Sequence, residues 1–131
     1  MDISSLSTEK ADGGAEMKLV HPIDGTPITD SDDNESSIVL YGMDSKVYAM
    51  AVRKRANKKM VRNKRAKRTD YGEIVDEGRQ LVAACIKEVR HVEYEGELLS
   101  NDADFIEVFA KLPWLYEQCD QFIHERANFL D

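Results

Sequence analysis

The pattern of apolar and polar positions near the end of the chain predicts an amphipathic helix. Apolar side chains recur there at spacings of three and four residues, at Leu112, Leu115, Tyr116, Cys119, Phe122 and Ile123. In a helix with about 3.6 residues per turn this spacing places them along one face. Pro113 suits the first turn, because the N–H that proline lacks would have no partner there. We predict a helix from Pro113 to Ala127 whose apolar face packs in the core.

A second apolar stripe predicts a longer helix from Asp70 to Arg90. Its members are Tyr71, Ile74, Val75, Gly78, Leu81, Val82, Cys85, Ile86 and Val89. Glycine inside a helix costs about 1 kcal/mol relative to alanine, so we expect Gly78 to mark a close crossing with another helix. This helix and the C-terminal helix should pack their apolar faces together.

Shorter elements are predicted between these two helices. Val92, Tyr94 and Leu98 around Glu95-Gly96 indicate a short extended turn. Ser100 or Asn101 can cap a brief helix that carries Phe105, Ile106 and Phe109. A residue before proline is biased away from helical geometry, so the chain should bend at Leu112.

The N-terminal half has weaker and more β-like patterns. Residues 1–16 are rich in Ser, Asp and Gly, and we expect a mobile tail. Met17 to Ile28 should form a short hairpin that turns at Asp24-Gly25. After an acidic loop, the β-branched and aromatic residues of Ser37 to Gly42 predict a strand.

A further helix should begin after Asp44 or Ser45, either of which can serve as its N-cap. Val47, Tyr48, Ala51 and Val52 give its first turns an apolar stripe. Like charges four residues apart oppose its continuation, so we place its stable part at Asp44 to Met60. The complete prediction is a mainly α fold: a flexible tail at residues 1–16, then a single helical domain at residues 17–131 with a short N-terminal antiparallel β element.

Two segments near the C-terminus resemble the tail assembly chaperones of long-tailed bacteriophages. They are EYEGELLSNDADFIEVFAKLPWL and the overlapping LPWLYEQCDQFIHERANFLD. The resemblance extends in organisation over Met43 to Asp131, and the basic run after Val52 departs from the family. It implies a non-enzymatic protein of the bacterial host cytoplasm that binds the tape-measure protein and helps recruit the tail-tube subunit, the major tail protein. Self-association is a further expectation.

The 131 residues carry a net charge of −7 that is strongly segregated. Ten bases and no acid lie between Arg53 and Arg68, whereas the rest of the chain has 8 bases and 25 acids. This basic helix could remain solvated or pair with acids of the same chain, bind an acidic protein, or bind nucleic acid. Nucleic-acid binding by this basic helix is the alternative function, although no aromatic residue within the run could stack on a base.

Candidate partner-binding residues lie in the basic run and at the start of the last helix. They are Arg55, Lys58, Lys59, Arg62, Lys64, Arg65, Trp114 and Tyr116. Trp114 lies one residue off the apolar stripe. It can seal the junction between the brief helix and the final helix, or stand exposed as an anchor for a partner. We favour the sealing role because the bend before Pro113 needs a packed side chain.

Other chemistry is weakly represented in the sequence. Cys119 and His124 are five residues apart and point about 140° away from each other on a helix, so they do not share a metal site. No catalytic or phosphate-binding motif occurs, and we expect neither an enzyme nor a cofactor. Cys85 and Cys119 should be buried free thiols. No apolar run approaches the roughly 20 residues of a membrane span, so we expect a cytoplasmic protein.

Overall fold

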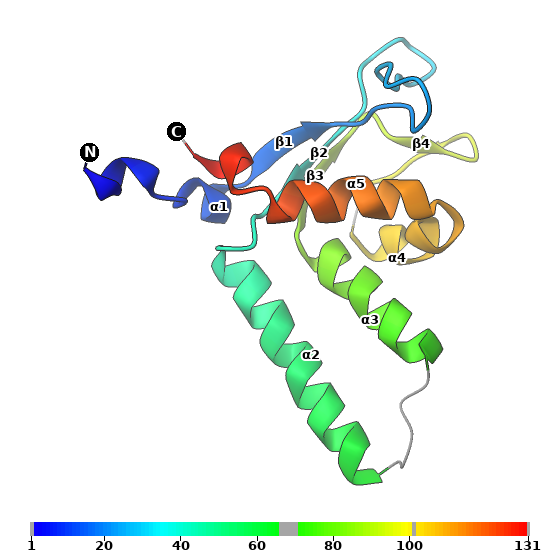
Figure 1. The fold of residues 1–131 in the computed structure, drawn as a ribbon. Coiled ribbons are helices and arrows are strands. Elements are labelled where there is room, and N and C mark those ends of the chain that lie inside the picture. Colours follow the sequence, from blue (N-terminus) through cyan, green and yellow to red (C-terminus); the bar gives the residue numbers. More distant parts are fainter. Residues whose placement is uncertain (1, 66–70, 101, 131) are drawn as a thin grey trace.

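The computed structural model describes residues 2–65, 71–100 and 102–130, with side chains at 2–57, 77–100 and 102–130. Its helices are α1 (Lys10–Gly13), α2 (Lys46–Arg65), α3 (Tyr71–Ala84), α4 (Asp102–Lys111) and α5 (Pro113–His124). Its strands are β1 (Ala15–Lys18), β2 (Ser37–Leu40), β3 (Ile86–Arg90), β4 (Glu93–Tyr94) and β5 (Glu97–Leu98). Two 3₁₀ turns, η1 (Ile3–Leu6) and η2 (Arg126–Phe129), lie near the ends of the chain (Figure 1).

An antiparallel sheet with the order β1-β2-β3 supports one side of the molecule. Met17 lies opposite Ile38, and Ile38 lies opposite Val89, so apolar side chains share one face of the sheet. The alternate positions Glu16 and Lys18 are exposed on the other face. This alternation follows from the two-residue period of a strand and gives the sheet one buried face and one solvated face.

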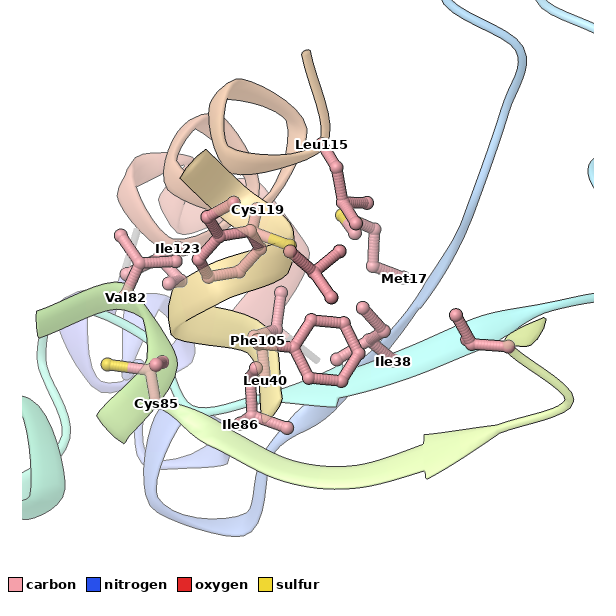
Figure 2. Packing of buried hydrophobic residues seen from close by; sticks show 14 of the residues in the cluster. Met17, Ile38, Leu40, Val82, Cys85, Ile86, Phe105, Leu115, Cys119 and Ile123 are labelled. Atoms are coloured by element: carbon pink, nitrogen blue, oxygen red, sulfur yellow. The ribbon is translucent and has the colours of Figure 1, made fainter. Parts of the chain in front are cut away.

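The core lies between the buried face of the sheet and helices α3, α4 and α5. Figure 2 shows side chains from all these elements converging on it. Its fully buried members include Ile38, Leu40, Phe105, Cys119 and Ile123. The spacing of Leu115, Cys119 and Ile123 therefore did identify a buried helix face. Both cysteines are buried free thiols, as expected.

The prediction of one helix from Asp70 to Arg90 is wrong in its last third. Helix α3 ends at Ala84, and Ile86–Arg90 forms strand β3 beside β2. The N–H of Tyr41 donates to the carbonyl of Cys85 at 2.8 Å, where the pairing of the two strands begins. Ile86 and Val89 are three residues apart, a helical spacing, and a bulge opposite Val39 and Leu40 lets both contact the core from a strand. The neighbouring strand decides in favour of β structure because it satisfies the backbone groups that a helix would otherwise bond internally.

The fold is consequently mixed α and β rather than mainly α. Helices dominate the chain, as predicted, but the antiparallel sheet takes its third strand from the middle of the sequence. The predicted hairpin of Met17 to Ile28 is only partly formed. A single bridge joins Val20 to Pro27 around the expected turn, while β1 pairs with β2.

The tail expected at residues 1–16 contributes to the folded structure. Ala15 and Glu16 belong to β1, and Ala11 in α1 is almost completely buried. Ala11, Ala15 and Phe129 form a small apolar cluster of their own. The sequence did not predict this role because the buried residues of the segment are alanines, which carry little apolar surface.

The helix boundaries around Pro113 agree with the sequence. Leu112 has nonhelical backbone angles, and Pro113 occupies the first turn of α5. Helix α5 ends at His124, three residues before the predicted end at Ala127, and η2 follows. The cap predicted at Asn101 lies outside the described residues.

Candidate interaction surface

Helix α2 begins with a side-chain cap and then leaves the body of the protein alongside α3 (Figure 1). The hydroxyl of Ser45 accepts a hydrogen bond from the N–H of Tyr48 at 3.0 Å, which satisfies one of the free donors of the first turn. Of the two predicted caps, Ser45 is therefore the one used. The helix continues to Arg65, five residues past the predicted stable end at Met60.

Two apolar side chains on α2 face solvent where the basic run begins. Met50 is 68% exposed and Val52 is 40% exposed. The next residues, Arg53 and Lys54, are exposed cations. A flexible, exposed methionine adapts to partner surfaces of irregular shape. This part of α2 thus combines apolar contact area with positive charge.

Arg55 turns toward α3 rather than away from the protein. Its Nε lies 3.6 Å from a carboxylate oxygen of Glu77. The two residues also line a cavity of about 100 Å³ between α2 and α3, together with Ala51, Lys54, Gln80, Leu81 and Ala84. That volume is well below the roughly 300 Å³ typical of a small-molecule site, so the junction is better suited to side-chain contacts.

Helix α5 meets the α2–α3 pair through two tyrosines. The hydroxyl of Tyr116 lies 3.0 Å from the position of a side-chain carbon on Gly78, so the tip of the tyrosine ring, rather than the backbone of α5, lies against this glycine. Tyr48 on α2 hydrogen-bonds His124 Nε2 at 3.1 Å, and their rings meet edge to face. His124 Nδ1 lies 3.3 Å from a carboxylate oxygen of Asp120. These contacts hold the base of α2 against the end of α5.

Two tyrosines and one cysteine at this junction are protonated at neutral pH. Burial is the main cause that raises the pKa of Tyr48 and of Tyr116 above the ordinary value. Burial also raises the pKa of the Cys85 thiol to about 12. A nucleophile requires the thiolate or phenolate form, so these groups offer hydroxyl donors and packing area instead.

The structure separates the predicted site residues into three groups. Arg55 and Tyr116 come together at the junction of α2, α3 and α5. Trp114 is half-buried and packs against the core. The side chains of the other predicted residues, Lys58, Lys59, Arg62, Lys64 and Arg65, lie outside the described residues.

Sequence reasoning missed several contributors to this surface. Tyr48 was assigned only to an apolar stripe, and His124 was considered only as a metal ligand. Met50 was not singled out, because its exposure depends on the direction in which α2 leaves the body. Within the described part of the chain, no group of three acidic, histidine or cysteine side chains could hold a metal ion. No described helix is long and apolar enough to cross a membrane.

Comparison with protein families, curated proteins and solved structures found no match to this chain.

Proposed function

We propose that this protein is a non-enzymatic tail assembly chaperone of a long-tailed bacteriophage, acting in the host cytoplasm. In this role it binds the tape-measure protein and helps recruit the major tail protein during tail assembly. The resemblance of the segments that include LPWLYEQCDQFIHERANFLD supports the proposal. The absence of a catalytic motif in the sequence and the protonated thiol and phenols of the α2–α3–α5 junction agree with a binding role.

The observation that carries this proposal is the exposed apolar and basic surface of α2. Met50 is exposed on a helix that extends away from the core, on the same side as Arg53 and Lys54, three and four residues later. Val52, two residues after Met50, is exposed on a different side of the helix. A chaperone of a long helical protein needs such a surface, because amphipathic helices dock through apolar side chains at helical spacing. The contact must also be reversible, and a small apolar area flanked by charge provides limited affinity.

Charge gives this surface a preference among partners. Arg53 and Lys54 are exposed beside Val52. Opposite charges speed association and disfavour basic partners. We therefore expect α2 to bind an acidic, amphipathic stretch of the tape-measure protein.

Co-expression with the tape-measure protein of the same phage tests the proposal. The wild-type chain should raise the soluble fraction of the tape-measure protein and copurify with it. Replacing Met50 and Val52 by Glu should abolish copurification while the variant stays folded. The matched control is Leu98→Glu, because Leu98 is also exposed but lies on the distant β5. Unchanged tape-measure solubility with the wild-type chain, and no complex, would refute the chaperone function.

The ten bases between Arg53 and Arg68 support nucleic-acid binding as the second candidate. Phosphate contacts release counterions, so such a complex would weaken steeply between low and moderate salt. A mobility shift with DNA or RNA that disappears when Lys58, Lys59, Arg62, Lys64 and Arg65 become Gln would support it. A tape-measure complex that depends on Met50, together with no mobility shift of DNA or RNA, would favour the chaperone instead.

A further inference from the structure

Strand β1 is an edge strand whose outer side is open. The N–H of Leu19 donates to the carbonyl of Ser36 at 3.0 Å, so this N–H points toward the β2 side of the strand. Antiparallel pairing alternates, and the peptide groups of Met17 therefore also face β2. Those of Glu16 and Lys18 face outward, and no described backbone or side-chain group bonds them there.

The next residue with outward-facing peptide groups, Val20, is already bonded by a side chain of α5. This side chain bonds Val20 as a neighbouring strand would. Gln118 Nε2 donates to the carbonyl of Val20 at 2.8 Å, and Gln118 Oε1 accepts from the N–H of Val20 at 3.4 Å. The outward groups at Val20 are thus satisfied within the chain. Unsatisfied outward groups remain at Glu16 and Lys18, where another strand can pair.

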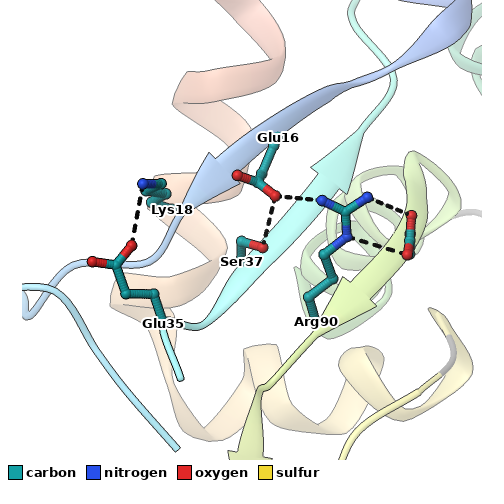
Figure 3. A network of polar contacts seen from close by, with 6 residues as sticks. Glu16, Lys18, Glu35, Ser37 and Arg90 are labelled. Atoms are coloured by element: carbon teal, nitrogen blue, oxygen red, sulfur yellow. Dashed lines mark hydrogen bonds and ion pairs between the residues drawn. The ribbon is translucent and has the colours of Figure 1, made fainter. Parts of the chain in front are cut away.

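The charged side chains of β1 complement those of a second, antiparallel copy of β1. Figure 3 shows Glu16 and Lys18 on the solvated face of the sheet, in ion pairs with Arg90 and Glu35 respectively. In an antiparallel pair of two β1 strands centred on Met17, each Glu16 lies opposite Lys18 of the second copy. A centre at Glu16 or at Lys18 would instead place like charges opposite each other, which is destabilising. A centre at any of these three residues aligns the outward peptide groups, so the charges favour the Met17 centre.

A groove beside β1 provides apolar area for the same contact. It has a volume of about 350 Å³ and is lined by Met17, Lys18, Val20, Gln118, Gln121, Phe122, Glu125 and Asn128. Phe122 and Val20 are half-buried in the single chain. A second copy placed along β1 would cover this groove and extend the sheet across a twofold axis.

We propose that two copies of this chain dimerise through antiparallel pairing of their β1 strands, with Met17 opposite Met17 of the second copy. Glu16 and Lys18 then exchange two backbone hydrogen bonds on each side of the axis, and their side chains form cross-strand ion pairs. The result is a continuous six-stranded sheet. This dimer rests on β1 and α5 alone and does not depend on the proposed chaperone function.

Sedimentation velocity of the full chain tests the dimer, at about 100 μM because small interfaces give weak association. Wild-type protein should sediment as a dimer. Lys18→Glu places two acids opposite each other on both sides of the axis and should weaken dimerisation about tenfold or more. The double variant Glu16→Lys with Lys18→Glu restores opposite charges and should restore the dimer. Lys111→Glu, with the same charge change on the distant α4, should leave it unchanged.

Two further variants test the strand register without relying on charge. Lys18→Pro removes an outward N–H that β2 does not use, so it should abolish the dimer and preserve the circular-dichroism spectrum. Mixing Glu16→Cys with Lys18→Cys should give a disulfide-linked heterodimer, because residues in a hydrogen-bonded antiparallel pair lie about 5.5 Å apart. Neither variant alone should cross-link efficiently. A monomeric wild-type chain, or a dimer that survives Lys18→Pro, would overturn the proposal. The role of Lys18 would then be to prevent pairing of the β1 edge with other strands.

Discussion

The hydroxyl of Tyr116 lies 3.0 Å from the position that a side-chain carbon would occupy on Gly78. The absence of a side chain on α3 therefore lets α5 approach with a large aromatic ring. Gly78→Ala adds helix propensity worth about 1 kcal/mol, but the new methyl group presses on the hydroxyl. In a Tyr116→Phe background that pressure is relieved, so Gly78→Ala should stabilise the protein by about 1 kcal/mol.

Urea denaturation of the four proteins in this double-mutant cycle measures the coupling. We expect a clearly smaller gain, or a loss, when Gly78→Ala is made with Tyr116 present. An identical effect in both backgrounds would show that the close approach has no energetic consequence.

Among the glycines whose surroundings the structure describes, Gly42 is expected to be the least replaceable. A side-chain carbon there would lie 2.9 Å from Ala11 and 2.9 Å from the ring of Phe129. Gly42→Ala should cost about 1 to 3 kcal/mol by overpacking this cluster. Gly13→Ala is the matched control in thermal denaturation, since no atom lies within 4 Å of the corresponding position. Equal melting temperatures for the two variants would contradict this account.

Trp114 should contribute more to stability than to partner binding. It is half-buried and packs against the main core at the junction of α4 and α5. Trp114→Ala should cost about 2 to 3 kcal/mol, less than the loss of a fully buried ring. Tryptophan emission of the wild-type chain should be blue-shifted before any partner is added. Emission typical of water-exposed indole, with unchanged stability in the variant, would identify Trp114 as a partner contact.

Acid should weaken the hydrogen bonds that join Asp44, just before α2, to Thr8 and Arg126 near the two ends of the chain. Arg126 donates to both oxygens of Asp44, at 2.9 and 3.1 Å, and the hydroxyl of Thr8 donates at 2.9 Å. These bonds lower the pKa of Asp44 below 3.8. A carboxyl with a lowered pKa stabilises the fold above its ordinary pKa, and this contribution is lost as the pH falls through its pKa in the folded state.

The expected result is a decrease in stability below about pH 4 that is smaller in Asp44→Asn. Its size should be about 1 kcal/mol or less, because Asp44 and Arg126 are partly exposed. Urea midpoints between pH 3 and pH 7 provide the measurement. Asp32→Asn, in an exposed loop, should leave the decrease unchanged.

The two cysteines should be unreactive in the folded protein. Burial raises the pKa of Cys85 and of Cys119 to about 12, and both side chains are fully buried. Iodoacetamide at pH 8 should therefore modify neither residue until the protein unfolds, because the thiolate is the reactive form. Mass spectrometry with and without urea gives the comparison. Rapid modification of native protein would contradict the burial.

The features that the sequence could predict are local ones. The apolar stripe of α5, the proline at its start and the bend at Leu112 depend on neighbouring residues and on the backbone limits of proline. A contact from another helix at Gly78 also followed from local reasoning, although a tyrosine side chain rather than a close backbone crossing supplies it. For the candidate surface, the apolar and charge pattern placed basic residues up to Met60 on a stable helix, and Arg55 and Tyr116 do come together beside it.

The features that the sequence could not predict depend on distant partners. Residues 86–90 form a strand because β2 lies beside them, although their apolar spacing suits a helix equally well. The exposure of Met50 and the contact of Tyr48 with His124 depend on how α2 leaves the core. The sequence by itself therefore determined where helices begin and which helix faces are apolar, because short-range geometry sets both. Only the tertiary structure decided the third strand, the burial of Ala11 and Ala15 and the open edge of β1, because long-range contacts select among locally equivalent conformations.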